Sequence, residues 1–232
     1  MTAFDLSLHS DGAGDSIPFT VIASDAGMLL PCCEELPNAD LVGLFSHPVE
    51  TDHLGFSMGE RYELIVDFAG FENQNITMKN LNAIPGNLDY AATDRVIRFV
   101  VGKAKGDAAP DKPTPSDLRY LPPPPQTSVT KDFVFSRVGD EWVINGVGWA
   151  DIEHRILTRP TLGADEIWEL RHGGGNATHP IHIHLVDFQV LSRTGGRNAV
   201  TPYEAAGMKD VVWIAPGETV RVVARYAPWK GV

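Results

Sequence analysis

The sequence predicts an all-β protein of 232 residues, and three observations support this fold class. Proline and glycine are abundant, with 17 and 22 copies, and such a density of helix breakers favours short strands joined by turns. No segment keeps an apolar period of 3.6 residues over three helical turns, which argues against alternating strands and helices. Runs of β-branched and aromatic residues recur between turn residues along the chain.

Four strands are expected in the first hundred residues, at 17–24, 61–68, 75–81 and 95–102. In the segment 61–68, apolar side chains from Tyr62 to Phe68 alternate with Glu63 and Asp67. Because successive side chains of a strand point to opposite faces, this segment is expected to be half-buried. The segment 95–102 is interpreted as an edge or inner strand.

The composition shifts at residues 103–126, where proline is dense enough to favour an extended polyproline conformation over a packed strand or helix. We interpret this segment as a linker between a first β unit, residues 1–102, and a second β unit, residues 127–232. The second unit contains six strand-like runs, DFVFSRV, EWVINGVGW, IWELRHGG, HPIHIHLVDFQVLSR, KDVVWIA and ETVRVVARY.

Charge and hydropathy argue against several kinds of partner. The net charge of -11 leaves no basic surface to neutralise phosphates, so no nucleic-acid partner is expected. No run approaches the roughly 20 apolar residues of a membrane span, and no signal peptide opens the chain at Met1. The only cysteines, Cys32 and Cys33, are neighbours and cannot cross-link distant strands.

One short motif carries the chemistry of this sequence. Residues 178–184 read THPIHIH, with three histidines in six residues of a strand-like run. In a strand, His182 and His184 share one face while His179 points the other way, which predicts one imidazole pair and one separate imidazole. Ordinary strand histidines are the alternative, but three clustered together favour a metal site. Imidazole suits zinc, copper, iron or nickel, so the ligand type alone leaves the metal open.

The segment THPIHIHLVDFQVLSR resembles the first C-terminal copper motif of multicopper oxidases, most closely the branch with bilirubin oxidase and the spore-coat laccases. Further segments resemble that branch in the same order: IPFTVIASDAG, SMGERYELIVDF, INGVGWAD, IWEL and KDVVWIAPGETVRVVARYAPWKGV. The resemblance covers most of the chain. The linker and residues 31–46, which contain the cysteine pair and are interpreted as an insertion, match least.

The resemblance implies cupredoxin-like Greek-key β-sandwich or barrel domains. It also implies an enzyme that oxidises a small-molecule electron donor, phenolic or tetrapyrrole-like, one electron at a time and reduces dioxygen to water at copper. By position in the motif, His179 corresponds to a ligand of type 1 copper, His182 to a ligand of type 2 copper and His184 to a ligand of the type 3 pair. The family is compatible with a secreted or extracellular location.

The sequence also departs from the family pattern. A second copper motif, His-Cys-His, is expected just beyond Val232, and the N-terminal domain that contributes to the copper cluster is missing. Residues 1–102 then correspond to part of the middle domain, and residues 127–232 to a C-terminal domain truncated before its last copper motif. We therefore expect a fragment that keeps three copper ligands, contains no complete catalytic site and is inactive in isolation.

Two other readings remain open from the residues. A cupin-like oxygenase or binding protein would use His182 and His184 to hold a single metal, with Asp187 as its acidic ligand. A cupredoxin-like fragment without catalytic function is the other alternative. The remaining histidines lack metal-ligand spacing and are interpreted as surface or turn residues: His9, His47, His53, His154 and His172.

Overall fold

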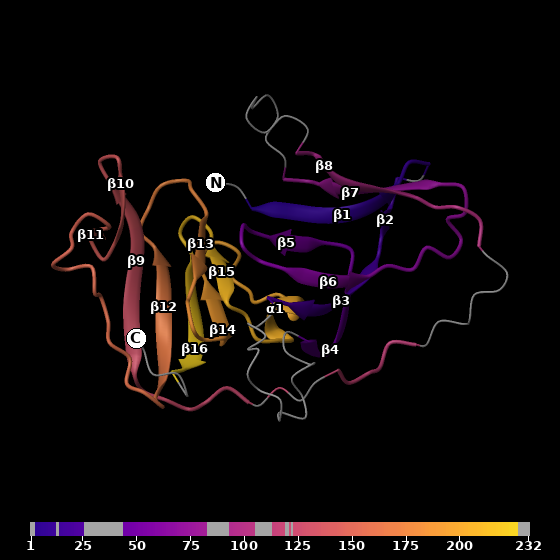
Figure 1. Ribbon diagram of the computed structural model, residues 1–232. Helices are drawn as coiled ribbons and strands as arrows, with labels where there is room; N and C mark the ends of the chain where they lie inside the picture. Colours follow the sequence, from indigo (N-terminus) through magenta and orange to yellow (C-terminus); the bar gives the residue numbers. More distant parts are fainter. Residues whose placement is uncertain are drawn as a thin grey trace.

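The computed structural model describes residues 3–12, 14–25, 44–82, 93–104, 113–118, 121 and 123–226. The regular structure of these residues is almost entirely β-strand, with one short helix among them (Figure 1). The predicted all-β fold class is therefore confirmed. Within the same residues, no helix is long and apolar enough to cross a membrane.

The N-terminal unit, residues 3–100, contains two antiparallel sheets among its described residues. One sheet has the order β2-β1-β7-β8, with β5 paired to β1. Its strands are β1 (Phe4–Ser10), β2 (Ser16–Ile17), β5 (Leu54–Phe56), β7 (Asn75–Asn80) and β8 (Arg95–Val100). The other sheet has the order β4-β3-β6. It is formed by β3 (Phe19–Ser24), β4 (Leu44–Thr51) and β6 (Tyr62–Ile65).

The core of the N-terminal unit explains why these runs are strands. Leu8, Phe19 and Ile76, from three different strands, are almost completely buried in one apolar cluster. In β6 the predicted alternation is present, because Tyr62 and Leu64 are partly buried while their neighbours are exposed. The strand β8 forms the edge of its sheet and is mostly exposed. The strand β1 was not expected from the sequence, where serines interrupt its apolar residues.

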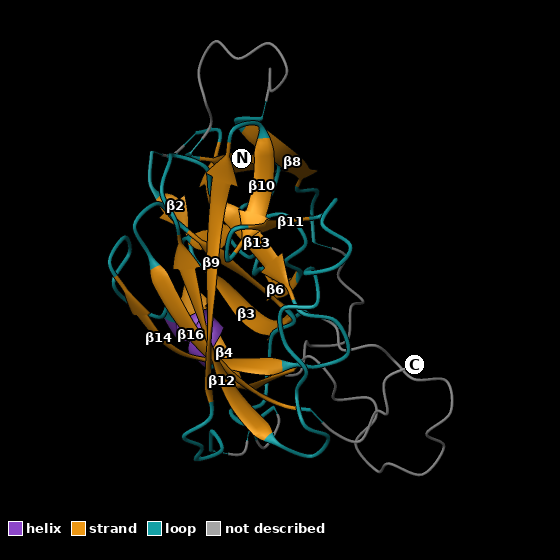
Figure 2. Ribbon diagram, turned by 90° about the vertical axis from the view of Figure 1, so that its left-hand side faces the viewer, coloured by secondary structure: helices purple, strands orange, loops and turns teal. Residues whose placement is uncertain are grey.

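The C-terminal unit, residues 130–226, is built on a sheet of order β11-β10-β9-β12-β16-β14, which faces the viewer in Figure 2. Its strands are β9 (Thr130–Val138), β10 (Glu141–Ile144), β11 (Val147–Gly148), β12 (Asp165–His172), β14 (Phe188–Thr194) and β16 (Thr219–Arg225). The strands β9 and β12 run parallel, and the other pairs are antiparallel. A smaller antiparallel sheet joins β13 (His179–His182) to β15 (Val211–Ile214).

One expected strand is divided in the structure. The run from residue 179 to residue 193 forms β13 and β14 with a turn between them, in which Leu185 has a φ of 71°. His184 therefore lies in this turn, and the expectation that it belongs to the same strand as His182 is wrong. The turn lets β13 pair with β15 while β14 pairs with β16, which places the two segments in different sheets.

The two units pack against each other through the helix α1 (Pro202–Ala205). Tyr203 and Ala206 join the apolar cluster of the N-terminal unit, although the C-terminal unit carries them. The amide of Gly55 donates a hydrogen bond to the Tyr203 hydroxyl at 2.8 Å, and the amide of Ser46 donates to the Ala206 carbonyl at 2.8 Å. Figure 1 shows α1 beside β3 and β4. The domain boundaries at residues 102, 103–126 and 127 stay a prediction, and Cys32 and Cys33 lie outside the described residues.

Candidate metal centre

His179 begins β13 and lies in an aromatic environment. Its ring is 4.9 Å from that of Trp142 and 4.9 Å from that of His172, measured between ring centroids. Its Nε2 is buried and has no hydrogen-bond partner among the residues that the structure describes. Burial lowers the pKa of His179, and the neighbouring His172 lowers it further. The ring is therefore neutral near pH 7, which is the form that binds a metal.

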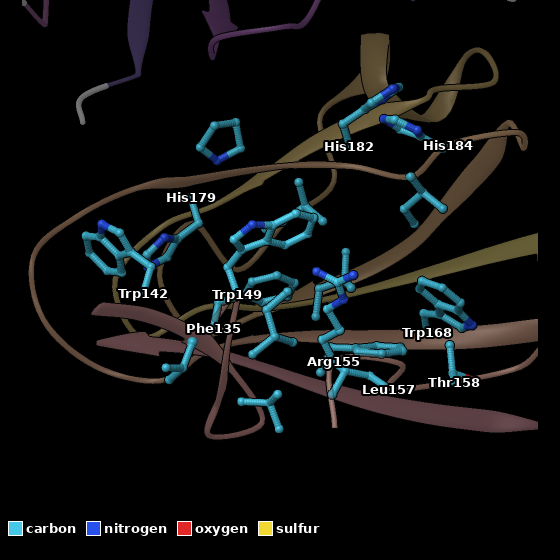
Figure 3. Close-up of a pocket in the computed structure, with 18 of the residues that line it drawn as sticks. Phe135, Trp142, Trp149, Arg155, Leu157, Thr158, Trp168, His179, His182 and His184 are labelled. Carbon is cyan, nitrogen blue, oxygen red and sulfur yellow. The ribbon is translucent and has the colours of Figure 1, made fainter. Parts of the chain in front are cut away.

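His182 and His184 lie side by side at the other end of β13, with 4.8 Å between their ring centroids (Figure 3). Both residues are exposed. The Nδ1–H of His182 donates a hydrogen bond to the Asp210 carbonyl at 2.9 Å. When a neutral imidazole donates through Nδ1, its Nε2 carries the lone pair that can coordinate a metal. The spacing thus predicts correctly that these two imidazoles are neighbours, even though a turn rather than a strand brings them together.

The three histidines of the motif form two separate groups. In Figure 3, His179 lies beside Trp142, away from the pair formed by His182 and His184. Among the described residues, no three His, Cys, Asp or Glu side chains gather closely enough to hold a metal ion. A single-metal site of the cupin kind, completed by Asp187, therefore finds no support in this part of the chain.

Asp210 is a site residue that sequence reasoning missed. It precedes β15, and the pairing of His182 with Val211 brings its carbonyl next to the His182 ring. Its carboxylate forms an ion pair with Arg61 of the N-terminal unit, with 2.7 Å between Nη1 and Oδ1. No local pattern signals this role, because 28 residues separate Asp210 from His182 and 149 residues separate it from Arg61.

A cavity of about 1220 Å³ opens beside His179. Its lining is dominated by apolar side chains from β9, β10, β12 and the loop after β11, including Phe133, Trp142, Trp149, Leu157 and Trp168. Arg155 lies over the ring of Trp149, 5.0 Å from its centroid (Figure 3). All three motif histidines also contribute to the wall, so both imidazole groups border the same cavity.

The other histidines are held by hydrogen bonds to the protein or lie apart from the motif. His172 lies in β12, where its Nε2–H donates to the Ala177 carbonyl at 2.6 Å and its Nδ1 accepts from the Gly174 amide at 3.1 Å. His9 lies in β1 and is partly buried. The interpretation of these two as surface or turn residues is therefore wrong. His53 and His154 are exposed, as expected, and each lies beside a carboxylate.

The donor set of the site fits copper. Imidazole nitrogens are common ligands of copper, and among the described residues the Nε2 atoms of His179 and His182 make no hydrogen bond to protein. The buried Nε2 of His179 is informative because a buried polar atom without a partner carries a desolvation cost that coordination would remove.

Comparisons with known proteins point to one family. The family model described as multicopper oxidase matches residues 119–232. Bilirubin oxidase of Albifimbria verrucaria is 44% identical over 231 residues, which cover 96% of this chain and 37% of that protein. A laccase of Haloferax volcanii is 30% identical over 240 residues, which cover 99% of this chain and 38% of that protein.

Solved structures show the same relationship. The McoA multicopper oxidase of Aquifex aeolicus superposes with a TM-score of 0.74 at 26% identity, covering 98% of this chain and 46% of that one. A laccase of Pediococcus acidilactici gives a TM-score of 0.69 at 26% identity, covering 97% and 42%. The chain thus spans less than half the length of the relatives that it matches. Sequence, fold and the HPIHIH motif together place it in the multicopper oxidase family.

Proposed function

We propose that this chain supplies part of the copper site of an oxidase that takes single electrons from a phenolic or tetrapyrrole-like donor and reduces dioxygen to water. The family supports a copper cofactor, and relatives named bilirubin oxidase and laccase support this class of donor. One structural observation carries the proposal: a four-residue strand presents one imidazole at its start and a pair of imidazoles at and just after its end.

Each histidine has a proposed role. His179 is a ligand of type 1 copper, His182 of type 2 copper and His184 of one type 3 copper. Copper in such sites supplies one-electron redox chemistry. The protein holds the neutral His179 ring against Trp142 in a partly buried place, and it fixes His182 through the Asp210 carbonyl. The backbone of β13 connects the two groups directly.

The same proposal assigns the units. Residues 1–102 form part of a middle cupredoxin-like domain, residues 103–126 a linker, and residues 127–232 most of a C-terminal cupredoxin-like domain. The partners of the complete site are an N-terminal domain, the electron donor and dioxygen. Because no three ligands converge among the described residues, we expect the chain by itself to bind copper weakly and to have no oxidase activity.

A copper titration tests the role of the histidine pair. In the isolated chain, without the further ligands of the type 2 and type 3 ions, we expect the two neighbouring imidazoles to share one Cu²⁺. Calorimetry with Cu²⁺ should show weak binding that His182→Ala and His184→Ala each reduce by at least about tenfold, because one of these two ligands is lost. The matched control is His47→Ala, which removes an imidazole that bonds to the hydroxyl of Ser46. If His182→Ala and His47→Ala bind copper equally well, the motif histidines are structural and the proposal fails.

A further inference from the structure

The orientation of the His182 ring depends on which oxygen of Asp210 accepts its proton. The Nδ1–H bonds to the Asp210 carbonyl at 2.9 Å, and the carboxylate oxygen Oδ1 of the same residue lies 3.8 Å from Nδ1. Two acceptors of one residue therefore compete for one donor. A carboxylate is the stronger acceptor because its hydrogen bonds are charge-assisted. Another group must therefore prevent the carboxylate from accepting the hydrogen bond of the His182 Nδ1–H.

Arg61 binds the Asp210 carboxylate through both terminal nitrogens of its guanidinium group. Nη1 donates to Oδ1 at 2.7 Å and Nη2 donates to Oδ2 at 2.7 Å. Nη1 also donates to the Gly59 carbonyl at 2.8 Å, which orients the guanidinium plane. The bidentate geometry fixes both oxygens of Asp210 in a way that a single point charge cannot match. Arg61 immediately precedes β6 and thus belongs to the N-terminal unit.

Asp25, at the end of β3, fixes the backbone on which this arrangement rests. Its buried Oδ2 accepts hydrogen bonds from the amides of Asp210 at 3.2 Å and Val211 at 3.3 Å, and its Oδ1 accepts from the amide of Arg61 at 3.0 Å. Asp25 has a φ of 41°, in the left-handed region that costs free energy for a residue with a side chain. One carboxylate thus joins the backbones of Arg61 and Asp210 across the two units.

We propose that Arg61 is a positioning residue for His182: by occupying the Asp210 carboxylate, it keeps the imidazole on the Asp210 carbonyl and its Nε2 directed beside His184. This inference rests on the proposed function, because it concerns how His182 and His184, proposed there as neighbouring ligands, share one Cu²⁺ in the isolated chain. Its consequence is that Arg61, a residue of the N-terminal unit, shapes the copper-binding pair without being a ligand itself.

The test is the binding of Cu²⁺ to the full chain, measured by calorimetry and by electron paramagnetic resonance of the bound ion. In the wild type, hyperfine splitting should report two imidazole nitrogens. In Arg61→Ala the freed carboxylate turns the His182 ring away from His184, so the affinity should fall about tenfold and the splitting should report one nitrogen. Arg61→Lys keeps a cation beside the carboxylate and should recover part of the affinity.

Two controls separate positioning from a general loss of structure. Arg225→Ala removes another bidentate pair, with Asp165, in the sheet of the C-terminal unit. Tyr203→Phe removes a hydrogen bond between the two units, to Gly55, without touching Asp210. Both variants should bind Cu²⁺ with the wild-type affinity, and their spectra should still report two coordinated imidazole nitrogens.

The outcomes distinguish this inference from the proposed function. If His182→Ala binds copper as the wild type does, the proposed function fails. If His182→Ala weakens binding but Arg61→Ala leaves the affinity unchanged or raises it, or keeps two nitrogens, the role of Arg61 is overturned and the proposed function stands. If the spectrum of Tyr203→Phe also reports only one coordinated nitrogen, the loss is caused by altered packing between the units. The role of Arg61 is then overturned as well.

Discussion

At the scale of single residues, charged side chains are buried where the two units meet. Arg193 on β14 is inaccessible to solvent and forms ion pairs with Glu204 and with Glu218, the latter at 3.1 Å. It also donates to the Trp213 carbonyl at 3.0 Å. The charges are tolerated because every partner in this group is paired and hydrogen-bonded, whereas an isolated buried ion would be strongly unfavourable.

Removing Arg193 should therefore destabilise the protein strongly. Arg193→Met leaves the buried carboxylate of Glu204 without its cation and Glu218 paired only with the less buried Arg197. We expect a loss of about 3–5 kcal/mol in the free energy of unfolding. Urea denaturation measures this loss. The control is Arg171→Met, which breaks an exposed pair with Asp132 and should cost less than about 1 kcal/mol. Equal effects of the two substitutions would contradict the role given to burial.

A second buried group predicts how stability depends on pH. Burial by itself lowers the pKa of Lys209, but the carboxylates of Glu60 and Asp25 outweigh it and raise that pKa. Burial, together with Glu60, raises the pKa of Tyr62, which accepts a hydrogen bond from Lys209 at 3.0 Å. Both groups keep their protons in the folded state at a pH where the unfolded chain releases them, so folding binds protons at alkaline pH.

The free energy of unfolding should therefore fall as the pH rises above about 10, where unfolded Lys and Tyr titrate. Below that pH both groups are protonated in the two states, and they contribute no pH dependence. Urea midpoints between pH 8 and pH 11 measure the slope. Tyr62→Phe removes one of the two protons and should give a shallower slope; an unchanged slope would contradict the assignment.

At the scale of elements, the turns that join strands decide where the sheets can lie. Gly195 follows β14 with a φ of 66°, and a Cβ added there would lie 2.2 Å from the carbonyl oxygen of Gly217 in the turn before β16. Gly146 follows β10 with a φ of 79°, but open space surrounds it. Glycine is needed at position 195 because of both the backbone conformation and the close approach of Gly217. At position 146 it is needed for the backbone conformation alone.

Alanine substitutions should separate these two effects. Gly146→Ala is expected to cost about 1 kcal/mol, the strain of a left-handed backbone with a side chain. Gly195→Ala should cost about 3 kcal/mol or more, because the backbone of the neighbouring turn must also move. Thermal and urea unfolding of both variants measure the difference. Similar costs would show that the turn containing Gly195 and the turn containing Gly217 are not in close contact.

At the scale of the whole molecule, the copper chemistry of the chain should be incomplete. No cysteine follows His179 in the sequence, and an intense blue absorption band requires a cysteine thiolate bonded to copper. Absorption spectra of the protein titrated with Cu²⁺ should therefore lack this band. An intense blue band would contradict the ligand set proposed for His179.

Oxidase activity gives the broadest test. The chain alone should consume no oxygen with a phenolic donor, because its two histidine groups each lack further ligands among the described residues. A longer reading frame that adds an N-terminal domain and a His-Cys-His segment should consume oxygen. The measurement is oxygen uptake by both proteins, with a His182→Ala version of the longer one as control. Equal rates for the short and long proteins would refute the multicopper mechanism.

Local patterns in the sequence determined much of this protein. Alternation of apolar and polar residues was enough to predict β6, and runs of β-branched residues predicted β3, β7, β12 and β16. The HPIHIH motif was enough to predict the family and the separation of His179 from the other two histidines. These features are local: strand periodicity and motif spacing depend on neighbours within a few residues.

Only the tertiary structure decided which residues far apart in the sequence meet. It placed Asp210 against His182, Arg61 against Asp210 and Lys209 among buried carboxylates, and it set Tyr203 of α1 into the N-terminal core. The sequence alone could not predict these contacts, because a charged side chain is normally exposed to solvent. Its burial becomes favourable only when packing of the fold places a partner of opposite charge beside it. Partners 149 residues apart, such as Arg61 and Asp210, leave no periodic signal in the sequence.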